Sequence, residues 1–138
     1  MVDGPTQASD LDQTENNRAV VRSFVETVLI SRQIAWLTDY IVDGTYTEHN
    51  PRLTDDVSTL SAALDAPHDG CKYGDYQHLH RVLAEGNFAL CQSEGGLGGI
   101  HVAFYDLFRL ANGKIVEHWD ATEKIAPRSK WKNDNGKF

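Results

Sequence analysis

The chain has 138 residues, with 13 Lys and Arg against 20 Asp and Glu and a formal net charge of -7 at pH 7. This length is typical of one domain that can bury a hydrophobic core. Because no basic stripe runs along the chain, nucleic acid and anionic membranes are not expected as partners.

The sequence shows no signal peptide and no transmembrane segment. Its first apolar run, residues 19–30, is interrupted by Arg22, Ser23, Glu26 and Thr27, and it is too short to cross a bilayer. We therefore expect a cytoplasmic protein. Free thiols at Cys71 and Cys91 are expected in a reducing compartment, and a single bridge between them stays open.

The first half of the chain is predicted to be helical. Residues 1–13 are interpreted as a flexible leader, after which an apolar stripe of helical period follows Thr14. A second, shorter helix is predicted after Ser31 and a third after Thr54, each residue acting as the N-cap. The stripe of the first helix consists of Val20, Val21, Phe24, Val25, Val28 and Leu29.

The second half is predicted to form four strands, over 77–84, 87–94, 101–110 and 114–125. Their short connections make them antiparallel neighbours in chain order. The fold class is therefore α+β, with a curved antiparallel sheet packed on N-terminal helices. We expect a cavity at one end, rimmed by the third helix and a His49-Asn50-Pro51 corner, and a polar tail over 127–138.

The last two strands form a hairpin whose register the sequence leaves open. A two-residue Asn112-Gly113 turn would place Asp106 opposite Trp119, whereas a three-residue loop beginning at Ala111 would place it opposite His118. We choose the three-residue loop, because it gathers polar groups within an apolar face, as in a binding pocket. That face is predicted to hold Phe104, Asp106, Phe108, Val116, His118 and Asp120.

Four stretches carry a resemblance to a known family. They are Tyr46-Thr-Glu-His-Asn-Pro51, Leu83-Ala-Glu-Gly-Asn87, Asp106-Leu-Phe-Arg109 and Gly113-Lys-Ile-Val-Glu-His-Trp-Asp120. Over about residues 14–126 the chain resembles the SnoaL-like branch of the nuclear-transport-factor-2-like superfamily. The resemblance implies a cone-shaped α+β barrel with a deep pocket and one domain over 14–126.

The resemblance also implies a chemistry. The polyketide cyclases of this family close a ring by aldol condensation without metal or cofactor, and the position of their acid/base aspartate is Asp120 here. His118 matches the histidine two residues before it. At Asp106 the cyclases carry a histidine, and the related ketosteroid isomerases carry a hydrogen-bonding aspartic acid.

Each candidate catalytic residue has a functional and a structural interpretation. Asp120 is predicted to be a general acid/base, or else a structural carboxylate bonded to His118 or to a backbone amide. His118 would orient that acid or donate to an oxyanion, or else be a satisfied core histidine. Asp106 would fix the His118 tautomer or donate to substrate, or else form a buried ion pair.

We predict a cofactor-independent cyclase, lyase or isomerase acting on a small carbonyl compound. The alternative is a non-catalytic binding or dimerisation module of the same fold. No metal is expected, because the His and Asp spacing matches no metal motif. A homodimer through the sheet face is expected, with Trp119, Ile115 and Glu117 on that outer face. The predicted substrate-binding residues are Tyr46, His49, Asn50, Trp36 and Phe104.

Overall fold

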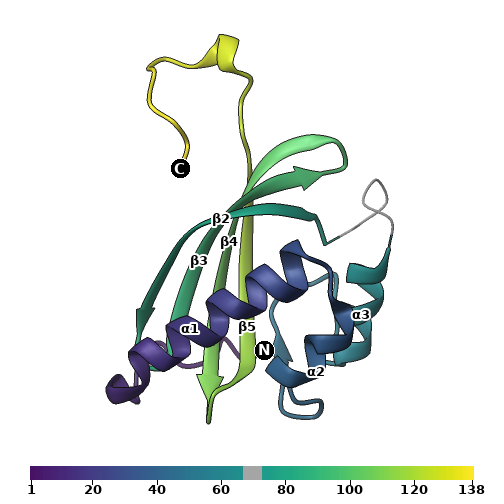
Figure 1. The fold of residues 1–138 in the computed structure, drawn as a ribbon, viewed down its shortest axis with the longest axis vertical. Helices are drawn as coiled ribbons and strands as arrows, with labels where there is room; N and C mark the ends of the chain where they lie inside the picture. The colour runs from purple at the N-terminus through teal and green to yellow at the C-terminus, as the bar shows by residue number, and fades with distance from the viewer. Residues whose placement is uncertain (67–72) are drawn as a thin grey trace.

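The computed structural model describes residues 1–66 and 73–138 as a bent sheet with helices packed on one face (Figure 1). Helix α1 (Thr14–Phe24) and its π-helical continuation η2 (Val25–Ile30) cross the sheet, following the turn η1 (Leu11–Gln13). The shorter helices lie beyond the C-terminal end of η2. They are η3 (Ile34–Trp36), α2 (Leu37–Tyr40) and α3 (Val57–Asp65). The predicted α+β class is confirmed.

The antiparallel meander is also confirmed. It consists of β2 (Asp75–Glu85), β3 (Phe88–Leu97), β4 (Ile100–Ala111) and β5 (Lys114–Lys124). A two-residue strand, β1 (Thr47–Glu48), pairs in parallel with β5 and gives the sheet order β1-β5-β4-β3-β2. This strand is not among the four predicted from the sequence, and its pairing was not predicted.

Helix α1 buries the predicted apolar stripe against the sheet. Val21, Phe24 and Val28 are at most 1% exposed, and the Phe24 ring meets that of Phe108 edge to face at 5.5 Å. Replacing a buried phenylalanine such as Phe24 by alanine typically costs about 3–5 kcal/mol. No helix within the described ranges is long and apolar enough to cross a membrane.

Two predicted helix caps are wrong. The helix after Ser31 begins later, with Gln33 at its N-cap position. Helix α3 is capped by Asp56, whose carboxylate accepts the Ser58 amide at 2.8 Å. A carboxylate caps as well as a hydroxyl and also favours the helix dipole.

The last hairpin corrects the predicted register. Asn112 and Gly113 both have positive φ, 51° and 73°, so they form the two-residue turn that matches strand twist. Pairing then passes from Leu110–Ile115 to Arg109–Glu117, which makes Val116 the extra residue of a β-bulge. Beyond the bulge Asp106 lies opposite Asp120, and Phe108 lies opposite His118.

The bulge explains which residues reach the inner face. Asp106 and His118 share that face, as predicted, although they are not direct partners. Ile115, predicted to face outward, is fully buried, while the half-buried Val116 does not continue the inner-face alternation. One inserted residue thus brings both Ile115 and His118 into the core.

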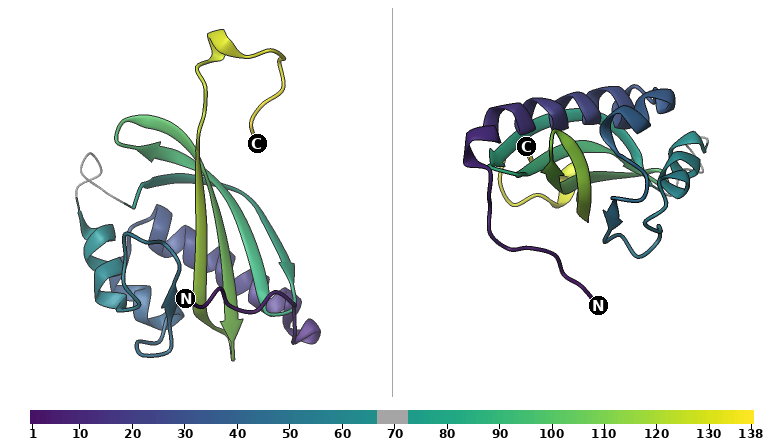
Figure 2. Two further views of the ribbon diagram at one scale, coloured as in Figure 1. Left: turned by 180° about the vertical axis from the view of Figure 1, so that it is seen from behind. Right: turned by 90° about the horizontal axis from the view of Figure 1, so that it is seen from below.

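The N-terminal segment passes over the other face of the sheet (Figure 2). The Ser9 amide donates to the Asn87 side chain, and the Asn87 amide donates to the Ser9 carbonyl. Gly4 packs against Trp119, where a Cβ would come within 2.6 Å of the indole. The division into leader, domain and tail stays a prediction, and the expected Cys71 thiol or bridge lies outside the described residues.

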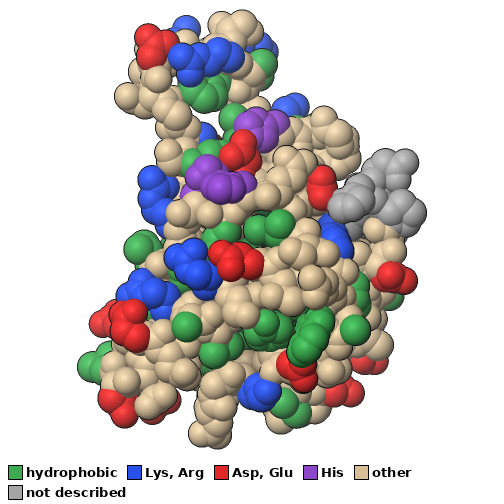
Figure 3. All heavy atoms as spheres, in the orientation of Figure 1, with side chains coloured by type: hydrophobic (Ala, Val, Ile, Leu, Met, Phe, Trp, Pro, Cys, Tyr) green, Lys and Arg blue, Asp and Glu red, His purple; other side chains and the backbone are tan. Residues whose placement is uncertain are grey.

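Acidic and basic side chains are interspersed over the face that carries α1 (Figure 3). Arg18 pairs with Glu15, and Arg22 pairs with Glu26, along the exposed side of this helix. The visible face therefore presents mixed charge rather than a single-sign patch.

Candidate active site

The segment between α2 and α3 runs beside β5 and contributes side chains to the site. Its extended backbone turns Tyr46 and Glu48 inward, and the parallel pairing places Glu48 beside His118. His49 turns the opposite way, because successive side chains of an extended segment alternate. On the outer face its ring stacks on Trp119 at 4.6 Å and contacts the Glu117 carboxylate at 2.8 Å.

Inside the sheet, His118 lies between two carboxylates. Its Nε2 is 3.0 Å from Asp106 Oδ1, and its Nδ1 is 3.0 Å from Glu48 Oε1. The Tyr76 hydroxyl donates to both oxygens of Asp106, and the Tyr46 hydroxyl donates to Glu48. The side chains of His118, Asp106 and Glu48 are all 0% exposed.

Electrostatics keeps this imidazole charged. Burial opposes the charge, but hydrogen bonds to Asp106 and Glu48 and the charges of those carboxylates outweigh burial and raise the pKa of His118 to about 10. Burial also raises the pKa of Glu48, yet the hydrogen bond from His118 and its charge leave that pKa below its usual value. The imidazolium form of His118 is therefore favoured between Asp106 and the Glu48 carboxylate.

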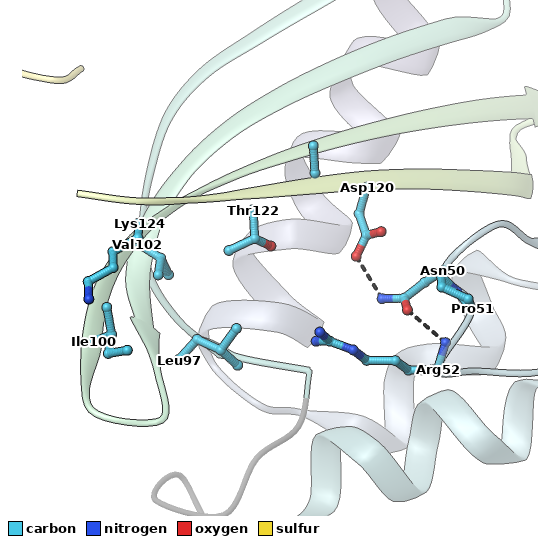
Figure 4. A pocket seen from close by; sticks show the side chains of 10 residues that line it. Asn50, Pro51, Arg52, Leu97, Ile100, Val102, Asp120, Thr122 and Lys124 are labelled. Atoms are coloured by element: carbon cyan, nitrogen blue, oxygen red, sulfur yellow. Dashed lines mark hydrogen bonds between the residues drawn. The ribbon is translucent and has the colours of Figure 1, made fainter. Parts of the chain in front are cut away.

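Asp120 has a different environment, although it lies directly across from Asp106. One oxygen accepts the Asn50 side-chain amide at 2.7 Å (Figure 4). Burial raises the pKa of Asp120, and Asp106 and Glu48 raise it further, while His118 and Asn50 lower it; the net shift is upward. A carboxyl group shifted in this way is suited to general acid/base chemistry nearer to neutral pH.

A pocket of about 400 Å³ opens beside Asp120. Figure 4 shows Asp120 pointing from its strand towards Asn50, with the Arg52 side chain passing below both and extending towards Leu97. A second hollow of about 420 Å³, against α3, shares Asn50 and Arg52 with the first. The first is lined by Asn50, Pro51, Arg52, Leu97, Ile100, Val102, Asp120, Ala121, Thr122 and Lys124.

The structure thus separates the predicted catalytic residues. Asp120 lines the pocket, whereas His118 and Asp106 are sealed beneath it. Among the predicted substrate-binding residues, Asn50 lines the pocket and Tyr46 belongs to the buried cluster.

Three predicted substrate-binding residues are not brought to the pocket beside Asp120. Trp36 lies in η3 with 54% of its surface exposed. The His49 ring lies on the outer face of the sheet. Phe104 is buried and stacks on Tyr76 with the ring centroids 4.0 Å apart.

Sequence reasoning missed Glu48 and Tyr76. Glu48 could have been found, since residues 46, 48 and 50 of an extended segment share one face. Tyr76 carried no local signal, because its hydroxyl meets Asp106 only after β2 has been placed two strands away from β4.

The outer face also differs from the prediction. Trp119 was expected to be exposed and available for a dimer, but His49 stacks on it and Gly4 packs against it. Leu83 and Leu90, which are cross-strand partners on β2 and β3, are instead 59% and 38% exposed. The homodimer stays a prediction.

Among residues 1–66 and 73–138, no group of three or more His, Cys, Asp or Glu side chains is arranged to hold a metal ion. Within the site, both ring nitrogens of His118 are engaged by carboxylates.

No family model matches the chain, and no curated protein sequence matches it. Solved structures are similar to it. A presumed ketosteroid isomerase from Kribbella flavida DSM 17836 gives a TM-score of 0.70 at 17% identity, over 91% of this chain and 94% of the other. An NTF-2 like protein of unknown function from Burkholderia xenovorans LB400 gives 0.64 at 20% identity, over 88% and 97%.

A third similar structure is an LEH-like epoxide hydrolase from M. tuberculosis, with a TM-score of 0.58 at 17% identity over 80% of this chain and 85% of the other. These likenesses confirm the fold that the resemblance implied. At such low identity they concern the fold alone, and the chemistry has to be argued from the site.

Proposed function

We propose that this chain, which has the nuclear-transport-factor-2-like fold, is a cofactor-independent acid/base enzyme acting on a small carbonyl compound. The reaction class is proton transfer at the carbon next to a carbonyl, as in an aldol-type cyclase, a lyase or an isomerase. Asp120 is the acid/base.

The observation that carries the proposal is the position of Asp120. It is a half-buried carboxylate on the wall of a 400 Å³ pocket, held at one oxygen by Asn50 and with a raised pKa. The other carboxylates of the inner cluster are fully enclosed. A general base must reach its proton, and Asp120 meets that requirement.

In the proposed step, Asp120 takes a proton from the carbon next to the carbonyl, and the C–H electron pair moves towards the carbonyl oxygen. A donor on the same wall, the Thr122 hydroxyl, is available to the resulting enolate oxygen. The proton then returns from Asp120 to the product.

The buried cluster acts through Asp120 and does not touch substrate. The negative charges of Asp106 and Glu48 raise the pKa of Asp120, and the positive charge of His118 limits that rise. These three residues are positioning residues in the proposal, which differs from the sequence prediction that His118 and Asp106 are catalytic.

The test is loss of α-protons from a ketone in D2O, followed by proton NMR. With 4-oxo-4-phenylbutanoate as the probe, wild-type protein should accelerate exchange at the carbon next to the ketone. Asp120→Asn should slow it by about 100- to 10,000-fold, while Asp43→Asn, at an exposed aspartate outside the pocket, should not. Equal exchange with wild type and Asp120→Asn would refute the proposal.

A non-catalytic binding module is the second candidate, and the enclosure of His118 and Asp106 favours it. In that case the cluster would only stabilise the fold, and the pocket would hold a ligand unchanged. Saturable probe binding without any exchange above the buffer rate would support this candidate.

A further inference from the structure

We propose that Arg52 and Lys124 form an anion subsite, so that the substrate is a small amphipathic carboxylate carrying its carbonyl group near Asp120. This inference deepens the proposed function and rests on it for the position of the carbonyl. It concerns a pair of cations that the proton transfer itself does not require.

The first support is that both cations are free to accept a ligand. In the part of the chain that the structure describes, neither the Arg52 guanidinium nor the Lys124 ammonium forms a hydrogen bond or an ion pair. Several other cations of this acidic chain are engaged: Arg109 binds Glu117 at 2.6 Å and Arg18 binds Glu15 at 3.1 Å. Two unpaired cations on one pocket wall therefore stand out.

The second support is the charge balance of the pocket. Among the described residues that line the pocket, Asp120 is the only carboxylate, and its amide partner Asn50 is neutral. With Asp120 ionised, Arg52 and Lys124 leave the wall with one net positive charge. That balance fits one carboxylate, which an arginine fork can bind through two parallel hydrogen bonds.

The third support is the arrangement seen in Figure 4. The Arg52 guanidinium extends into the middle of the pocket towards Leu97, and the Lys124 ammonium lies at the end near Ile100, away from Asp120. Leu97, Ile100 and Val102 supply an apolar wall near these cations. A ligand can therefore place its anion at the Arg52 guanidinium, with Lys124 further along the same wall, its apolar part against Leu97 and Ile100, and its carbonyl near Asp120.

The experiment compares two probes, 4-oxo-4-phenylbutanoate and its methyl ester, by NMR titration of the full chain. Both carry the same phenyl ketone, and only the acid carries the charge. The acid should bind wild-type protein more tightly, and added salt should weaken it because both cations are exposed. The double change Arg52→Gln and Lys124→Gln should weaken binding of the acid about three- to tenfold and leave binding of the ester unchanged.

Two control variants separate the explanations. Lys130→Gln removes one positive charge from the exposed tail helix η5 (Arg128–Lys130), outside the pocket, and should leave acid binding unchanged. Asp120→Asn removes a negative charge from the wall and should leave acid binding equal or tighter.

The outcomes are distinguishable. Equal affinity for acid and ester in wild type, or unchanged acid binding in the double variant, would overturn the anion subsite. Selective acid binding without any α-proton exchange would uphold the subsite and refute the proposed catalysis.

Discussion

Asp106 and Asp120 lie directly opposite each other on β4 and β5, yet only Asp120 reaches a pocket. Asp106 is enclosed and bonded to Tyr76 and His118, whereas Asp120 is half buried and bonded to Asn50. Facing carboxylates repel, and each favours the neutral form of the other. Since Asp106 is fixed by two donors, Asp120 is the member of the pair that is available to carry a proton.

This relationship predicts opposite pKa shifts from two substitutions. Asp106→Asn removes a negative charge that raises the pKa of Asp120, so that pKa should fall. Asn50→Ala removes a hydrogen bond that lowers it, so the pKa should rise. Carbon-13 NMR titration of the aspartate carboxyl groups measures both values, and shifts in one common direction would contradict this assignment.

The buried cluster predicts a dependence of stability on pH. The pKa of His118 is raised to about 10 in the folded state, against roughly 6.5 when unfolded. Its contribution is therefore complete below about pH 6.5 and is lost as the pH rises towards 10. The free energy of unfolding should fall over that range, with a slope of at most about 1.4 kcal/mol per pH unit from this group.

Urea unfolding of wild type and His118→Gln at several pH values measures that slope. The variant should be less stable at pH 6.5 and should lack the portion of the slope due to His118. Parallel curves for the two proteins between pH 6.5 and 10 would show that His118 is not charged in the fold.

The buried cluster also predicts that removing one hydrogen-bonding partner lowers the free energy of unfolding. Asp106→Asn takes one carboxylate from an imidazolium that is 0% exposed, and breaking a buried pair typically costs about 3–5 kcal/mol. Tyr46→Phe removes only a neutral donor to Glu48, for which about 1–3 kcal/mol is expected. Denaturant midpoints should rank wild type, Tyr46→Phe and Asp106→Asn in decreasing stability.

Much of the fold follows from local patterns. The stripe of α1 and the alternation of the long strands are strong periodic signals, and the Asn112-Gly113 pair marks its hairpin correctly. Local sequence does not determine the strand register, because the bulge at Val116 depends on burying both Ile115 and His118 in the core. The face of His118 was therefore predicted correctly while its partner was not.

The candidate site was predictable only in part. Asp120 and Asn50 were both identified, and their 2.7 Å contact follows from β1 pairing with β5. His49 and Asn50 were both predicted to contact the ligand, but successive side chains of an extended segment alternate, so Asn50 lines the pocket while the His49 ring lies on the outer face. The role of Tyr76 depends on strand order, which no pattern within its own segment specifies.

The bulge gives a further prediction. Deleting Val116 would restore regular pairing and force either Ile115 or His118 out of the core. Losing a fully buried side chain of this size should cost about 3 kcal/mol or more. Val116→Ala keeps the residue count and should cost about 1 kcal/mol, and equal losses for the two variants would show that the bulge does not set the register.

The most direct test of the central claim is the pH profile of α-proton exchange catalysed by wild type and by Asp120→Asn. The account predicts a wild-type rate that rises with pH through an apparent pKa above the usual value of about 3.9 for aspartate, and no such rise in the variant. An identical profile in the two proteins would contradict the assignment of Asp120 as the base.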